Sequence, residues 1–178
     1  KKDYEIFFKY DTHLNQLGCF LGVQQVLPMF DKNFEEIDLE NQNIDYTQKY
    51  VPHLNAHDDL AEISYMTWFF DDEKDPVFKD VIELDWVKYE AEQNVRQATL
   101  FENNNAKNDE KLLLVGDSYK TAMIPALTMY YSEVYVVHED FFSDEIFKEI
   151  APNKVIVEKV ERNSQKIGDF LCRALKNG

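Results

Sequence analysis

Long apolar runs, cysteines and positive charges are all scarce in this sequence. No apolar run approaches the roughly 18–20 residues that a membrane-spanning helix needs, so we expect no membrane span in this chain. The opening residues KKDYEIFF are too short and too acidic for a signal peptide. Cys19 and Cys172 lie far apart in the sequence, so this single potential pair establishes neither a disulfide nor a redox compartment.

The shortage of positive charge bears on binding partners. Lysine and arginine number 19 against 34 aspartates and glutamates, which gives a net charge of −15 at pH 7. Residues 31–110 hold 21 acidic and 7 basic residues, a net of −14, and so carry nearly all of the excess. A surface this acidic repels nucleic acid and anionic lipid. We therefore expect no nucleic-acid partner.

The apolar content is sufficient for a folded domain. With 178 residues, of which 44% are hydrophobic, the chain lacks the composition of a disordered protein. A chain of this length buries roughly 70% of the surface of its unfolded form, so a core can form without a metal or disulfide. We expect a single domain over residues 1–178, with an acidic, loop-rich insertion at about 31–110 and a helix near 85–95 inside it.

Before and after this insertion, the spacing of apolar residues predicts regular strands and helices. Near the start, a strand is expected at 4–8 and an amphipathic helix at 14–27, where Gly18 and Gly22 share a face and would let another backbone come close. After the insertion, strands at 112–115, 134–138 and 154–160 alternate with helices at about 118–131, 143–150 and 165–176. This alternation predicts an α/β fold, with a parallel sheet covered by helices on both faces.

The segment KLLLVGDSYKTAMIP, residues 111–125, places Ser118 where a strand turns into a helix. Ligands of parallel α/β folds bind at the carboxyl ends of strands, so Ser118 is a candidate nucleophile. It is equally a candidate helix N-cap, because the serine hydroxyl oxygen readily accepts hydrogen bonds from the free backbone N–H groups of the first turn. Asp117 would also suit a phosphoacceptor or a magnesium ligand, but no second carboxylate cluster follows another strand.

A serine nucleophile needs a histidine base and a carboxylate that orients the histidine. The histidines are His13, His53, His57 and His138. His13 has the most suitable neighbours, because Asp11 precedes it in a loop between a strand and a helix. The alternative is that Asp-Thr-His forms a helix-capping turn with an exposed histidine.

Metal binding is the other chemistry that the histidines suggest. His53 and His57 form an H-x-x-x-H pair, but the glutamate of the H-E-x-x-H pattern is missing and Pro52 precedes the pair. The acidic run DDEKD at 71–75 lacks the ligand spacing of an EF-hand. We expect neither a metal nor a cofactor.

The stretch DTHLNQLGCFLG, followed after the insertion by LLLVGDSYKTAMIPALTMYYSEVYVV and then by VIVEKVERN, resembles a known family. It is similar to the catalytic core of the SGNH-like alginate O-acetylation proteins and the related Asp-His-His-Trp (DHHW) family of bacterial surface proteins. The resemblance covers about residues 4–163, and 105 positions separate His13 from Ser118. It implies an SGNH-hydrolase-like, flavodoxin-like fold in which the motif order is permuted.

The resemblance also implies a catalytic triad. Ser118 would be the nucleophile, His13 the general base and acid, and Asp11 the orienting carboxylate. Leu14 departs from the family pattern, which has an aromatic residue after the histidine.

An oxyanion would be held by backbone N–H groups at the turn, with Ser118 and Gly116 as the expected donors. Asn15, or one of the three asparagines at 103–105, would add a side-chain donor.

The function implied is acyl transfer, most specifically the O-acetylation of a bacterial surface polysaccharide or exopolysaccharide. Its partners would be a polysaccharide acceptor and an acetyl donor, supplied by a membrane acyltransferase, outside the cytoplasm. An acetylesterase with the same triad and a catalytically silent glycan-binding or scaffold protein are the alternatives. Because family members have a further N-terminal part, we expect this chain to be the C-terminal portion of a longer protein.

Overall fold

A computed structural model describes the chain in several stretches, which are residues 6–8, 12–32, 34–38, 44–45, 77–78, 85–90, 97–161 and 167–168. The chain divides into two compact units, Lys1–Ile82 and Glu83–Gly178. Among the described residues, every helix is too short or too polar to cross a membrane.

The longest helix among the described residues of the first unit is α1, Gln16–Val26, which continues into a 3-10 turn η1, Leu27–Met29. This confirms the expected helix, although its buried residues, among them 17–20 and 23–24, are not confined to one narrow face. Asn15 begins it, because its Oδ1 accepts the N–H of Gly18 at 2.9 Å. The buried apolar side chains recur every three or four residues, at Leu17, Phe20, Val23 and Leu27.

The residues before α1 double back on the chain. Phe7 and Leu14 form an isolated antiparallel bridge, and the N–H of Asn15 donates to the carbonyl of Ile6 at 3.1 Å. Within the described residues 6–8, the expected strand is therefore reduced to this bridge.

Gln24 ties a later segment to α1 inside the same unit. Its side chain is buried, and its amide donates to the carbonyl of Ile37 at 3.1 Å while accepting the N–H of Ile37 at 3.0 Å. Both polar atoms of the buried amide are thus satisfied. The unit also holds a short antiparallel pair, β1 (Ile44–Asp45) with β2 (Val77–Phe78).

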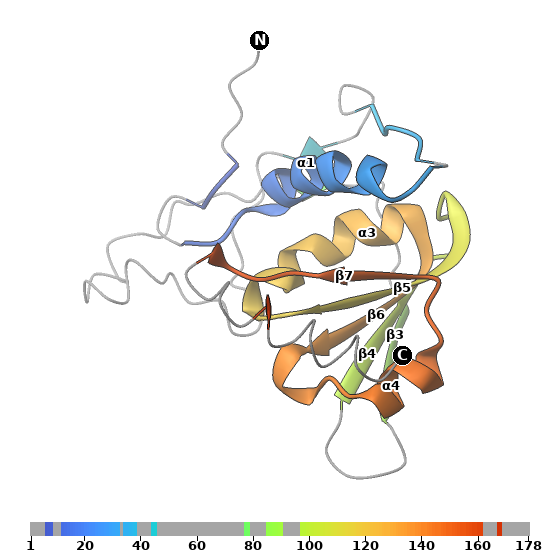
Figure 1. The fold of residues 1–178 in the computed structure, drawn as a ribbon. Helices are drawn as coiled ribbons and strands as arrows, with labels where there is room; N and C mark the ends of the chain where they lie inside the picture. Colours follow the sequence, from blue (N-terminus) through green and yellow to red (C-terminus); the bar gives the residue numbers. More distant parts are fainter. Residues whose placement is uncertain are drawn as a thin grey trace. The chain divides into compact units, whose positions relative to one another are not determined.

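The second unit is built on a five-stranded sheet in the order β3-β4-β6-β5-β7 (Figure 1). Its strands are β3 (Asp85–Glu90), β4 (Gln97–Glu102), β5 (Asn108–Gly116), β6 (Tyr131–His138) and β7 (Lys154–Val157). Strand β5 is parallel to both neighbours, β6 and β7. The α/β fold is confirmed, and its parallel part is this group of three strands.

The sheet is mixed rather than wholly parallel, because β4 runs antiparallel to β6 and β3 antiparallel to β4. The helix expected near 85–95 is wrong over residues 85–90, which form β3 and pair with β4 along its whole length, and residues 91–95 lie outside the described residues. Pairing with a neighbouring strand outweighs the weak helical pattern of this segment.

Two helices cover the sheet on opposite faces, α3 (Ile124–Tyr130) on one and α4 (Asp144–Ile150) on the other (Figure 1). The reason is topological. From β5 the chain passes through α3 to β6 on one side, and from β6 it passes through α4 to β7 on the other side of β5. Because both crossovers are right-handed but run in opposite directions along the sheet, the two helices lie on opposite faces. The expected helix at 118–131 is a 3-10 helix η4 (Ser118–Met123) followed by α3, which begins near Pro125.

Strand β5 passes through the core of this unit. Its apolar residues 112–115 are completely buried, as the continuous apolar run predicts. The face toward α4 is one cluster, made of Ala98, Leu100, Leu113, Val115, Tyr135, Val137, Ile146 and Ile150. The rigid centre of the sheet therefore leads directly into the Gly116–Ser118 turn.

Gly18 and Gly22 test the packing of α1 as a matched pair. A Cβ at Gly18 would lie 2.1 Å from the carbonyl oxygen of Ile6, whereas one at Gly22 would meet no described residue within 4 Å. The expected close backbone approach is thus confirmed at Gly18, and at Gly22 no described backbone comes close. We predict that Gly18→Ala lowers the free energy of unfolding by about 1–3 kcal/mol and Gly22→Ala raises it by about 0.5–1 kcal/mol. Urea denaturation followed by tryptophan fluorescence measures both, and equal effects would contradict the packing described.

Candidate active site at the carboxyl end of β5

Asp117, not Ser118, caps the helix that follows β5. Its Oδ1 accepts the N–H of Tyr119 at 3.1 Å, and its backbone is extended, as an N-cap requires. Ser118 is the first residue of η4 and is exposed. Among the described residues, none forms a hydrogen bond with the Ser118 hydroxyl. The turn therefore presents this hydroxyl at the edge of the sheet.

The carboxylate of Asp117 is held by several donors. Besides Tyr119, the N–H of Val160 donates to Oδ2 at 3.3 Å, and Lys159 Nζ lies 3.5 Å from the same oxygen. Burial alone would raise the pKa of Asp117, but these N–H groups and the Lys159 ammonium outweigh it and hold the pKa below its usual value. Both oxygens are engaged within the protein, which is the arrangement of an anchoring carboxylate rather than a phosphoacceptor or metal ligand.

Two lysines lie beneath the turn. The side chain of Lys159 is 2% exposed and bridges Asp117 and Glu139. Lys120 is also buried, and its ammonium donates to the backbone carbonyl of Asp117 at 2.8 Å. Burial lowers the pKa of Lys120, against the opposing effect of nearby carboxylates. Each buried ammonium is compensated by oxygen atoms, as low-dielectric surroundings require.

Glu158, the first residue after β7, packs directly on Gly116. A Cβ at position 116 would lie 2.7 Å from Glu158 Oε2 and 2.8 Å from the Glu158 carbonyl oxygen, so only glycine fits there. The N–H of Glu158 also donates to the carbonyl of Val115 at 2.8 Å. Burial, together with the adjacent Asp117 carboxylate, raises the pKa of Glu158 to about 7.

His138 ends β6 at the same edge of the sheet, in register with Gly116. Its Nδ1 accepts the N–H of Asp140 at 3.3 Å, and its side chain is 38% exposed. It is the histidine that shares a compact unit with Ser118.

The expected oxyanion donors Ser118, Gly116 and Asn15 have different surroundings in the structure. The N–H of Ser118 donates to no described residue, whereas the N–H groups of Tyr119 and Lys120 both donate to Asp117. Gly116 is buried at the end of β5. The side-chain oxygen of Asn15 caps α1 in the other unit. Ser118, Gly116 and Asn15 stay predictions as oxyanion donors.

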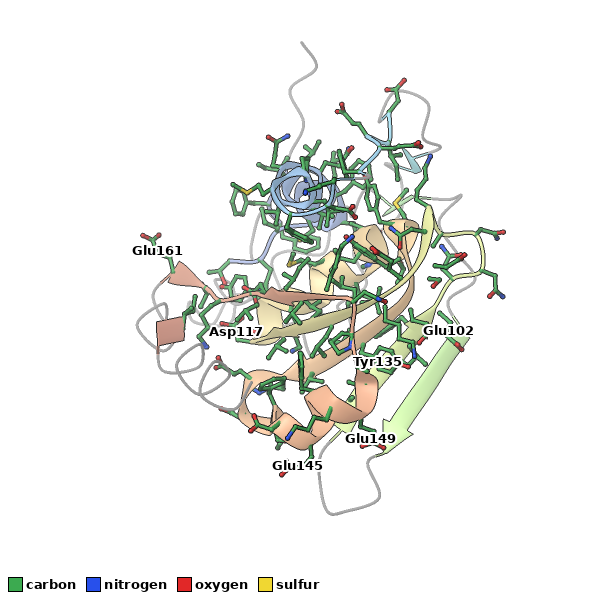
Figure 2. The ribbon with its side chains drawn as sticks, turned by 45° about the vertical axis from the view of Figure 1, so that its right-hand side comes forward. Glu102, Asp117, Tyr135, Glu145, Glu149 and Glu161 are labelled. Carbon is green, nitrogen blue, oxygen red and sulfur yellow. The ribbon has the colours of Figure 1, made fainter. Side chains whose placement is uncertain are left out.

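The asparagines at 103–105 are wrong as oxyanion candidates. They precede β5, and Asn103 is buried with its amide donating to the carbonyl of Thr128 at 2.8 Å. Figure 2 shows the neighbouring Glu102 and the candidate-site residue Asp117 at opposite ends of the sheet.

The predicted triad spans both compact units. His13 lies in the first unit, half-buried, and its backbone carbonyl accepts the N–H of Phe8 at 3.3 Å. Ser118 lies in the second unit, and Asp11 lies outside the described residues. The triad therefore stays a prediction.

The metal-ligand candidates His53, His57 and residues 71–75 also lie outside the described residues. In the part of the chain that is described, no three His, Cys, Asp or Glu side chains gather as a metal site would require.

Sequence reasoning missed the charged cluster of Lys120, Glu158 and Lys159. The available signal was the Glu-Lys pair directly after a predicted strand, since residues that follow parallel strands gather at one edge. What the sequence does not reveal is that β7 pairs with β5, which puts this pair beside the Ser118 turn.

The fold resembles solved bacterial structures. Bacillus cereus PatB1 with a sulfonyl adduct has a TM-score of 0.60 and 16% identity, over 89% of this chain and 60% of that one. Another structure of Bacillus cereus PatB1 has a TM-score of 0.59 and 18% identity, over 89% and 63%. A DHHW family protein from Eubacterium siraeum has a TM-score of 0.61 and 14% identity, over 88% and 59%.

These likenesses concern the fold, and the chain spans about three-fifths of the length of each neighbour. No protein-family model matches the sequence, and no curated protein matches it. The expected relation to the DHHW family is supported at the level of the fold, whereas the narrower resemblance to alginate O-acetylation proteins is not.

Two helix caps of the second unit test the anchoring of Asp117. Ser143 caps α4 through its uncharged hydroxyl, which accepts the N–H of Ile146 at 3.3 Å. We predict that Ser143→Ala costs about 1 kcal/mol of unfolding free energy, and Asp117→Ala roughly 2–4 kcal/mol, because the latter also removes a partner of the buried Lys159. Urea denaturation at neutral pH gives both values. If the two losses are equal, the Lys159 and Val160 contacts contribute nothing to stability.

Proposed function

We propose that this chain carries out acyl transfer with Ser118 as nucleophile, His13 as general base and acid, and Asp11 as the carboxylate that orients His13. The observation that carries the proposal is the exposed Ser118 hydroxyl at the carboxyl end of a central parallel strand, beside an aspartate whose oxygens are already engaged. An exposed hydroxyl on a rigid strand-to-helix turn is the geometry that serine nucleophiles of α/β enzymes use.

The chemistry proceeds in two steps. The Ser118 oxygen bonds to the carbonyl carbon of an acyl donor while His13 takes the hydroxyl proton, and the resulting oxyanion is held by the N–H of Ser118. Collapse of this intermediate expels the donor's leaving group, which receives the proton from His13. An acceptor hydroxyl then attacks the acyl-serine and gives its proton to His13, and the acylated acceptor leaves as the Ser118 oxygen is expelled and takes that proton back from His13.

A protein of similar fold supports the proposal of a nucleophilic side chain. One neighbour, PatB1, is known with a sulfonyl adduct. A sulfonyl group attaches covalently to a protein when a nucleophilic side chain displaces its leaving group. The same class of reagent is therefore a suitable probe for Ser118.

We propose the O-acetylation of a bacterial surface polysaccharide as the specific activity, outside the cytoplasm, with acetyl groups supplied by a membrane acyltransferase. This rests on the resemblance of the Asp-Thr-His and Gly-Asp-Ser segments to the O-acetylation families. An acetylesterase would use the same residues and differ only in the acceptor. Product analysis of the acetyl group, with and without an oligosaccharide acceptor, separates transfer to sugar from transfer to water.

Labelling with an aromatic sulfonyl fluoride tests the nucleophile. We predict a single adduct on the peptide that contains Ser118, and Ser118→Ala should remove both this adduct and the hydrolysis of a chromogenic acetate ester. The loss of activity should reach several orders of magnitude, as at other serine nucleophiles. The control is Ser132→Ala, near the start of β6 and far from the sheet edge that carries Ser118. It should retain both the adduct and the ester hydrolysis. Undiminished ester hydrolysis by Ser118→Ala would overturn the assignment.

Two histidine variants test the base. His13→Ala should lower the ester hydrolysis rate by several orders of magnitude, and Asp11→Asn nearly as much, because the histidine would adopt the wrong tautomer. His138→Ala should retain the activity, although His138 lies at the same sheet edge as Ser118. Steady-state kinetics with the acetate ester measure all three. If His138→Ala lost the activity and His13→Ala retained it, the base would be His138, in the second unit.

A further inference from the structure

The three residues after β7 run alongside the turn that carries Ser118, and they contact it at successive positions. The N–H of Glu158 donates to the Val115 carbonyl, and the Glu158 side chain covers Gly116. Lys159 and the N–H of Val160 both contact the Asp117 carboxylate. The path of this segment thus sets the position of the last three residues before Ser118.

Glu158 is the unusual member of this segment. Its Oε2 is fully buried and receives no N–H or other donor from the described residues, and the side chain it meets is the Asp117 carboxyl group, to which a neutral Glu158 donates a hydrogen bond. A buried polar atom of this kind is costly and calls for a structural or functional reason. The charged groups nearby are Asp117 from the turn, Lys120 from η4, and Lys159. Lys159 forms an ion pair with Glu139, the first residue of the 3-10 turn η5 (Glu139–Phe141).

We propose that Glu158, in its neutral form and together with Lys120, is a positioning residue that holds the Gly116–Ser118 turn in its reactive geometry. Glu158 supports the turn from the β7 side through its contact with Gly116. Lys120 supports it from the helix side through its bond to the Asp117 carbonyl. This inference rests on the proposed role of Ser118 as nucleophile.

The charge balance explains why the neutral form is the competent one. With Glu158 neutral, the ammonium groups of Lys120 and Lys159 are matched by the carboxylates of Asp117 and Glu139. Ionisation of Glu158 adds an unmatched negative charge beside Asp117, and Gly116 has no side chain to separate the two carboxylates. Like charges in a buried site repel strongly, so the turn is pushed away from β7.

The pH dependence follows with a definite sign. Because the pKa of Glu158 is raised from 4.5 to about 7 in the folded protein, the folded state holds a proton in this interval that the unfolded state has released. Stability therefore falls as pH rises through this interval. The contribution of neutral Glu158 to the reactivity of Ser118 should be lost around pH 7, where the folded-state carboxyl group ionises.

The experiment compares Glu158→Gln, which keeps the shape and the neutral charge, with the wild type between about pH 5 and pH 9. The control is Glu149→Gln, an exposed glutamate on α4 (Figure 2). The rate of Ser118 sulfonylation in Glu158→Gln, divided by the wild-type rate at the same pH, should rise above about pH 7 and reach roughly tenfold at pH 8, because the base His13 is common to both proteins. The same ratio for the control should not change with pH.

Thermal unfolding of the same three proteins gives a readout that is independent of Ser118. The melting temperature of Glu158→Gln, relative to the wild type, should rise by several degrees from pH 5 to pH 8. A difference that does not change with pH would overturn the titration of Glu158. A change in melting temperature with an unaltered rate profile would show a purely structural role and overturn positioning. If Ser118→Ala keeps its activity, the proposed function itself fails, whatever the melting temperatures show.

Discussion

The contact between Glu158 and Gly116 is the constraint on which the candidate site depends. It exists because β7 pairs with β5, so the residue after one strand lies beside the last residue of the other. The contact admits only glycine at 116, and the same segment continues to Lys159 and Val160, which hold the Asp117 carboxylate. Ser118 is exposed immediately beyond this anchored backbone. A nucleophile on such a support loses little mobility when the transition state forms.

The structure also assigns helix capping and the proposed nucleophile to two different residues, which the sequence alone does not distinguish. Serine and aspartate are both good N-caps, so Gly-Asp-Ser alone does not tell which residue caps the helix. In the structure Asp117 accepts the N–H of Tyr119, and the hydroxyl of Ser118 is left at the surface. The capping role and the proposed catalytic role thus fall on adjacent residues, each suited to its own task.

The pattern of apolar residues was enough to predict the elements around this turn. Strand β5, the helices α3 and α4, and the strands β6 and β7 lie where continuous apolar runs and helical spacing placed them. The acidic strand β3 was missed, because its strand character comes from pairing with β4 rather than from alternating hydrophobicity. The buried cluster of Glu158, Lys120 and Lys159 was missed for a related reason. Strand order is a property of the folded sheet, and charged residues in a sequence usually indicate a solvated surface.

We propose that His13 serves Ser118 as its base, although the two residues belong to different compact units. A crystal structure of the protein tests it most directly, through the distance between His13 Nε2 and Ser118 Oγ. We expect this distance to be about 2.6–3.2 Å, or slightly more in the absence of substrate. A separation beyond about 5 Å that no side-chain rotamer closes would contradict it, most clearly if the His138 ring were the one within reach of Ser118.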